Sequence, residues 1–221
     1  MTVIPWPLQP AGPRGRGAAA AQPDASSAWA LLRARRHVQP GRLFAPGPGP
    51  AELAAILDAA AHVPDPGQAL PWRLVLVPDA ARAAVAGVCA QALPPAPGQP
   101  NLAQGKALEA PALLLAVVDA GPDEACGMGL SARLVSAGCA LQNMLLMAAA
   151  QGYGTMLSGG EELQAPQLRA LFGLRDSEQA LCFLGMGTVQ ARKTAVRVRP
   201  AARTYVGTLG ADGRVRPLGH H

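Results

Sequence analysis

The apolar positions along the chain predict a succession of helices and strands. Helices are expected where apolar residues recur every three or four positions or where a capping residue precedes helix formers, and strands where apolar runs lie between turn residues. The helical segments cover 28–36, 50–61, 79–93, 101–109 and 166–172, and the strand-like runs cover 73–77, 112–119, 155–157 and 181–189. The two kinds of element do not follow a regular βαβ spacing, so the pattern favours an α+β fold.

The longest apolar stretch lies between Arg133 and Glu161, which enclose no charged residue. Its first part is apolar on every face of a helical wheel, and such a helix either spans a membrane or forms the buried centre of a protein. Ser136, Gln142 and Asn143 lie near its middle, and no basic residue flanks its far end. These features disfavour a membrane span and predict a buried helix of a soluble protein.

Glycines follow this helix, at Gly152, Gly154, Gly159 and Gly160. Because glycine has no Cβ, the backbone here can approach a ligand closely; the alternative is an ordinary tight turn. The glycines do not form a dinucleotide fingerprint or a phosphate-binding P-loop, and no serine stands in a nucleophile frame. The acidic pair that opens the next segment is interpreted as a solvated helix start. The residues alone therefore predict no catalytic side chain.

Composition limits the class of protein. The chain has 221 residues, of which 50% are apolar and 15% charged, so one domain with a full core is expected. The formal charge of +5 is concentrated in arginines near both ends, which suggests an anionic partner. Aromatic residues make up only 4%, which disfavours a nucleic-acid surface. Arg35 and Arg36 could meet Arg192 or Lys193 around a phosphate, although an ordinary solvated helix end is the favoured explanation of these residues taken alone.

The four cysteines form no CxxC pair and no metal-ligand spacing with the four histidines, so reduced cysteines, no bound metal and a cytoplasmic location are expected. Residues 1–24 are rich in Pro, Gly and Ala and do not resemble a signal peptide. The predicted organisation is a flexible extension over 1–24, one domain over 25–209 and a tail over 210–221.

Four blocks together resemble the nitroreductase family of FMN-dependent, NAD(P)H-using oxidoreductases, and most closely its compact bacterial branch. They are LLRARRH (31–37), ILDAAAHVPDPGQALPWRLVLV (56–77), SAGCALQNMLLMAAAQGYGTMLSGG (136–160) and FLGMGTVQARK (183–193). The resemblance implies a mostly antiparallel sheet flanked by helices, with the long central helix at a homodimer interface. It also implies hydride transfer from NAD(P)H to an electron-poor acceptor, such as a nitroaromatic or a quinone, by a ping-pong mechanism.

The resemblance further implies where FMN would bind. Arg35 and Arg36 would hold its phosphate and ribityl chain, joined by Arg192 or Lys193. The Leu157–Gly160 stretch would lie against the isoalloxazine, and the loop over 62–70 would reach the flavin of the partner subunit. The candidate cofactor-binding residues are Arg35, Arg36, His37, His62, Pro66, Gln68, Leu157, Ser158, Gly159, Gly160, Arg192 and Lys193.

Several of these positions depart from the family pattern. His37 replaces a serine, and Leu70 stands where a glutamine precedes Pro-Trp. Ser158 lies where the closest branch has an arginine. The sequence therefore retains the family's residues for the phosphate end of the cofactor and has fewer of its polar residues around the ring. A flavin-binding protein without turnover is accordingly the alternative function, and a basic nucleic-acid-binding protein is a third.

Overall fold

The computed structural model describes residues 24–64, 69–94, 109–122, 127–190 and 198–218. Contacts divide the chain into two units, Met1–Val189 and Gln190–His221, and each is described by itself. The sequence placed a domain boundary near 209, and that division stays a prediction. Two specific predictions fall on residues that the structure does not describe. The predicted short helix over 101–109 lies outside the described residues except at its last position, and the arginine and lysine at 192 and 193 lie wholly outside them.

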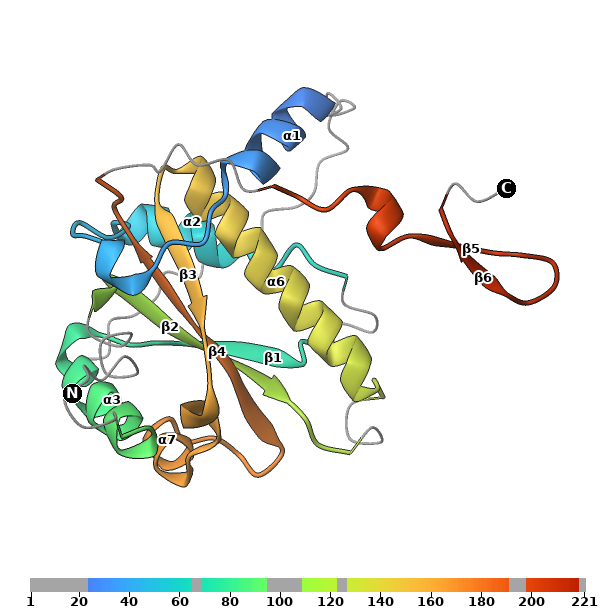
Figure 1. The fold of residues 1–221 in the computed structure, drawn as a ribbon. Helices are drawn as coiled ribbons and strands as arrows, with labels where there is room; N and C mark the ends of the chain where they lie inside the picture. Colours follow the sequence, from blue (N-terminus) through green and yellow to red (C-terminus); the bar gives the residue numbers. More distant parts are fainter. Residues whose placement is uncertain (1–23, 65–68, 95–108, 123–126, 191–197, 219–221) are drawn as a thin grey trace, which may run out of the picture. The chain divides into compact units, whose positions relative to one another are not determined.

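The first unit is built on a four-stranded sheet. Its strands are β1 (Trp72–Leu76), β2 (Ala112–Asp119), β3 (Gly154–Ser158) and β4 (Glu178–Gly187). Their order is β1-β2-β4-β3, and every neighbouring pair is antiparallel. This architecture confirms the predicted α+β class, and it leaves β3 at one edge of the sheet (Figure 1).

Helices cover both faces of this sheet, which explains why β2 is a continuous apolar run. They are α2 (Pro50–Ala59), α3 (Asp79–Ala92), α6 (Leu130–Ala150) and α7 (Pro166–Leu171). Leu113 and Leu115 of β2 belong to a core cluster shared with α3 and α7, whereas Leu114 and Ala116 belong to a second cluster with α2 and α6. Successive side chains of a strand point to opposite faces, so each face of β2 needs apolar residues.

The central helix α6 is buried where it packs against the rest of the chain and leaves some apolar residues exposed in the single chain. Leu134 and Val135 are 41% and 64% exposed, and Met147 is 36% exposed. The inward side instead buries a charge: Arg133 is fully buried and donates hydrogen bonds to the backbone oxygens of Asp119 and Gly121, at 2.9 and 2.7 Å. By length and composition α6 could cross a membrane, a test that core helices of soluble proteins also pass.

The first helix, α1, covers Ala25–Ala34 and is shifted toward the N-terminus relative to the predicted 28–36. Asp24 is its N-cap residue, so Ser26 and Ser27 lie inside the first turn instead of before it. Arg35 already has extended dihedral angles, with φ −63° and ψ 125°. Both predicted phosphate-binding arginines therefore follow the helix, in an extended chain.

That extended chain joins the sheet. His37 forms a parallel bridge with Thr155 of β3, and Phe44 forms an antiparallel bridge with Thr188 after β4. The 3-10 helix η1 (Pro40–Arg42) connects the two bridges. The segment after α1 is thus fixed to the edge of the sheet on which the candidate site lies.

We expect Gly154→Ala to lower the free energy of unfolding by about 1–3 kcal/mol, the range for overpacking a core. A Cβ at this buried glycine would overlap Cγ2 of Val189 and lie 3.0 Å from Cγ2 of Val38 and 3.1 Å from Cδ2 of Leu43. Denaturant unfolding measures the effect. Gly87→Ala is the matched control, because a Cβ there meets nothing within 4 Å; unfolding curves of equal midpoint for both variants would contradict the expectation.

The second unit contains a two-stranded antiparallel ribbon, β5 (Gly207–Leu209) and β6 (Val215–Pro217), preceded by the 3-10 helix η4 (Ala202–Thr204). Asp212 in the turn pairs with the Arg216 guanidinium at 2.5 Å. The sequence suggested that Tyr205 and Val206 could pack, but they are 70% and 38% exposed.

Candidate functional site

The edge strand β3 brings two of the predicted groups of site residues to one element. At its start, the Val38 N–H donates to the Thr155 carbonyl at 2.8 Å, which places His37 and the arginines before it beside the strand. Arg36 and His37 are exposed, and Arg35 is half-buried. The predicted cationic end is therefore open to a ligand.

The other end of β3 carries the predicted ring-side residues. Leu157 and Ser158 are half-buried, and Gly159 and Gly160 are exposed. Ser158 lies three residues beyond Thr155, about 10 Å along an extended strand. That separation suits an extended ribityl phosphate arm. Within the described ranges, the cationic segment pairs with β3 only at Thr155. Ser158 therefore lies past the point where this segment runs along the strand.

The two glycines after β3 lie close against the side chains behind them. A Cβ on Gly159 would lie 2.7 Å from Cδ1 of Leu163, and one on Gly160 would lie 2.5 Å from Oε2 of Glu162. A side chain at either position would force its neighbour to move. Both glycines are also exposed, so their backbone is accessible, as contact with a flat ring edge requires.

Ser158 supplies an independent sign of a ligand at this end. Its Oγ is buried and has no hydrogen-bond partner among the described residues. Buried hydroxyl groups are nearly always hydrogen-bonded, and an exception calls for a bound water or ligand. The orphaned hydroxyl and the uncovered glycine backbone fit a polar, flat group such as the flavin ring.

Glu162 corrects the interpretation of the acidic pair as a solvated helix start. The pair opens the 3-10 helix η3 (Glu161–Gln164), in which Glu161 is exposed but Glu162 is 1% exposed. No local pattern indicates this burial, because two adjacent glutamates before an apolar residue are also typical of a solvated helix start.

His62 is tied to the central helix and not to β3. Asn143 of α6 donates from Nδ2 to the His62 carbonyl at 2.6 Å, and the His62 side chain is exposed. The other predicted residues of this loop, Pro66 and Gln68, lie outside the described residues. Sequence reasoning missed Asn143, although it stood out as a polar residue within an apolar helix.

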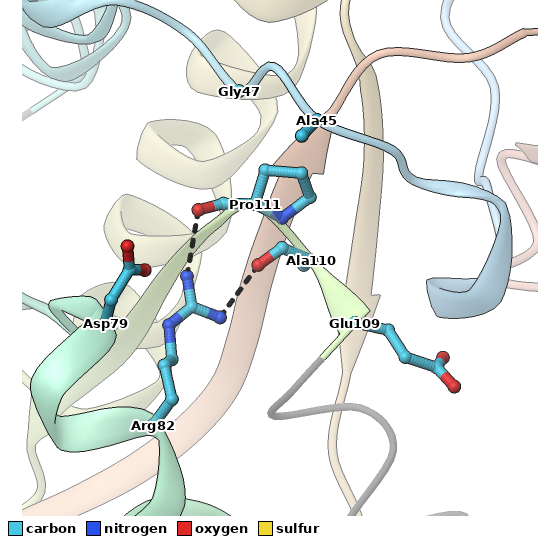
Figure 2. Close-up of a pocket in the computed structure, with 7 residues that line it drawn as sticks. All are labelled: Ala45, Gly47, Asp79, Arg82, Glu109, Ala110 and Pro111. Atoms are coloured by element: carbon cyan, nitrogen blue, oxygen red, sulfur yellow. Dashed lines mark hydrogen bonds between the residues drawn. The ribbon is translucent and has the colours of Figure 1, made fainter.

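A cavity of about 430 Å³ lies elsewhere, between the start of α3 and the start of β2 (Figure 2). Arg82, nearly buried, donates to the carbonyl oxygens of Val77, Ala110 and Pro111 at 3.1, 2.8 and 3.1 Å. Burial lowers the pKa of Arg82, and the charge of Asp79 partly opposes this shift. Among the residues that the structure describes, no predicted site residue lines this cavity, and the guanidinium serves to join α3 to β2.

Comparison with known proteins identifies the fold. The family described as "Nitroreductase family" matches residues 42–188. The Escherichia coli (strain K12) protein named "Putative NAD(P)H nitroreductase YdjA" is 32% identical over 160 residues, which cover 71% of this chain and 87% of that protein.

Two solved structures have the same fold. The nitroreductase-like family protein from Bacillus cereus superposes with a TM-score of 0.65 at 17% identity, covering 81% of this chain and 95% of that one. The NADPH:FMN oxidoreductase from Vibrio harveyi complexed with NAD⁺ gives a TM-score of 0.62 at 20% identity, covering 80% and 74%. These likenesses confirm the predicted nitroreductase-like fold.

Proposed function

Because the chain belongs to the Nitroreductase family, we propose that it is an FMN-dependent oxidoreductase that takes hydride from NAD(P)H and reduces an electron-poor small molecule. The observation that carries this proposal is the arrangement along β3. An exposed cationic segment lies beside Thr155, and uncovered glycine backbone with the orphaned Ser158 hydroxyl lies at the far end. The names of similar proteins, which include an NAD(P)H nitroreductase and an NADPH:FMN oxidoreductase, support it.

Each group of residues has a role in holding the cofactor. Arg35 and Arg36 would bind the phosphate and ribityl chain; the predicted phosphate residues Arg192 and Lys193 lie outside the described residues, and their role stays a prediction. The Leu157–Gly160 stretch would hold the ring edge through backbone N–H groups, which are preorganised donors and cost no reorganisation. When bound, FMN supplies the two-electron hydride chemistry, and the protein supplies binding, orientation and electrostatics.

The proposed reaction requires no nucleophile and no general base from the side chains of the protein. Its task is to leave one face of the ring open, so that the nicotinamide and the acceptor occupy the same place in turn. Because the nicotinamide and the acceptor cannot bind at the same time, we expect ping-pong kinetics, seen as parallel lines in double-reciprocal plots. Nitroaromatics and quinones suit an open face of this kind.

A homodimer with α6 at its interface agrees with the exposure of this helix. Its large apolar residues Leu134, Val135 and Met147 are exposed in the single chain, and exposed apolar residues that gather on a surface are typical of interaction sites. In the proposed dimer two α6 helices pack together, and the loop over 62–70 of each subunit contributes to the partner's flavin site. The enzyme is proposed to act in the cytoplasm.

The purified protein tests the function directly. We expect a yellow protein. NADH or NADPH should bleach its visible flavin absorbance in the absence of oxygen, and a quinone should restore it. A yellow protein that neither nucleotide bleaches would support a flavin-binding protein without turnover. A colourless protein that FMN does not stain would overturn both.

A further inference from the structure

Two of the polar residues within α6 bind the same stretch of chain. Asn143 donates from Nδ2 to the His62 carbonyl at 2.6 Å, just after α2. Ser136 accepts from Nε1 of Trp72 at 3.0 Å, at the first residue of β1. The two α6 residues are seven positions apart, hence on one side of the helix and about 10 Å apart along its axis. The helix therefore holds both ends of the stretch from His62 to Trp72.

The backbone just before the second attachment is strained. Leu70 has φ 40°, a left-handed conformation that a leucine rarely adopts, and its side chain is 61% exposed. The next residue is fixed on its far side, because the Pro71 carbonyl accepts a hydrogen bond from the Asp119 N–H at 2.8 Å. A residue stays in such a conformation only where its surroundings hold it, and such residues gather at functional sites.

The attachment at His62 is not explained by core packing. Ile56 and Ala60 already pack α2 against α6 in the core, whereas the hydrogen bond between Asn143 and His62 lies in an exposed setting. An exposed hydrogen bond adds little to folding stability, since water competes for both partners. It does fix the distance between one backbone atom and the helix.

We propose that Asn143 and Ser136 form a two-point clamp by which α6 positions the His62 end and the Leu70–Trp72 end of this stretch for the flavin ring. The proposal rests on the proposed function, because His62 is a site residue only if FMN binds. Asn143 is a positioning residue in this proposal: it acts through His62 and touches neither the cofactor nor the substrate. The clamp also gives α6 two tasks, an apolar side for a second subunit and a polar pair for the site.

Asn143→Leu tests the clamp, because leucine keeps the approximate volume and removes the donor. Loss of one hydrogen bond predicts a rise of about five- to tenfold in KM for NAD(P)H, a changed visible circular dichroism spectrum of bound FMN, and little change in thermal unfolding. Gln142→Leu is the matched control: it replaces the adjacent amide of the same helix, which is also half-buried, and should change neither readout. Asn143→Gln, which keeps a donor, should restore part of the loss.

A second variant covers the case in which Asn143→Leu does not fold. Ser136→Ala removes the other attachment and is expected to change the flavin spectrum and KM in the same direction. Wild-type-like spectra and KM for Asn143→Leu, or for Ser136→Ala where only that variant folds, would overturn the clamp and leave the proposed function intact. A wild-type protein that binds no FMN would overturn both.

Discussion

Replacing Glu178 with glutamine is expected to lower the free energy of unfolding at pH 7 by about 2 kcal/mol. Glu178 opens β4 and is 1% exposed, yet it is fully paired. Its Oε1 and Oε2 accept from Nε and Nη2 of Arg73 at 2.7 and 2.9 Å, and Oε1 also accepts from Arg175 Nη2 at 3.0 Å. Glutamine keeps the shape but loses the charge and turns one acceptor into a donor that faces a guanidinium.

The same carboxylate makes the fold sensitive to acid. Hydrogen bonds from Arg73, opposed by burial and aided by the Arg175 N–H and side chain, lower the pKa of Glu178 from 4.5 to about 2. Because the folded-state pKa is depressed, the stabilisation is complete above the unfolded pKa and is lost as pH falls from about 4.5 toward 2. The pKa difference corresponds to about 3 kcal/mol, which we reduce to about 2 because solvent screens the guanidinium groups.

Urea unfolding from pH 7 to pH 2.5 measures both effects. Wild type and Glu178→Gln should differ most at neutral pH and converge toward pH 2.5, as the wild-type carboxylate becomes protonated. Asp58→Asn is the matched control, since Asp58 is an exposed carboxylate on α2. A constant difference at all pH values would show that packing, and not charge, accounts for the loss.

The elements predicted best from the sequence are those whose pattern of apolar residues fits only one kind of secondary structure. The apolar run of β2 was predicted over 112–119 and is observed over the same residues, because a short apolar run between turn residues fits a strand covered on both faces. The face of α2 that was predicted to be apolar contains Ile56 and Ala60, which are both buried. Local periodicity is sufficient in these cases.

Features that depend on distant partners were predicted less well. An apolar helical wheel does not reveal which face meets the same chain and which meets another one, and only the structure shows that Leu134 and Val135 of α6 are exposed in the single chain. Glu162 was interpreted as solvated because its burial follows from the packing of η3 under Gly160.

The candidate site divides in the same way. Its cationic and glycine-rich ends were predicted from local sequence. The bridge between His37 and Thr155 brings the first beside β3, and the second begins at the far end of that strand. The attachment of His62 to Asn143 joins residues 81 positions apart. No spacing rule connects a backbone carbonyl after one helix with an amide in the middle of another, so only the structure could reveal it.

Arg36→Ala is expected to weaken FMN binding about ten- to a hundredfold, which corresponds to about 1.5–3 kcal/mol for one hydrogen bond to a charged group. Arg36 is exposed and directly precedes His37, whose bridge to Thr155 fixes the segment against β3. The anchored backbone gives the guanidinium a defined origin, so its contact with a phosphate costs less conformational entropy than one from a free chain end. Fluorescence titration of the apoprotein with FMN measures the change.

The control for Arg36→Ala must remove the same charge nearby without touching the site. Arg33 suits this purpose, because its guanidinium lies 5.2 Å from the ring centroid of Trp29, on α1 itself. Arg33→Ala should leave the FMN dissociation constant within about twofold, since exposed charges act weakly at a distance in physiological salt. Riboflavin separates the two ends of the cofactor. It lacks the phosphate, so Arg36→Ala should barely change its affinity, and an equal loss for riboflavin and FMN would place Arg36 away from the phosphate.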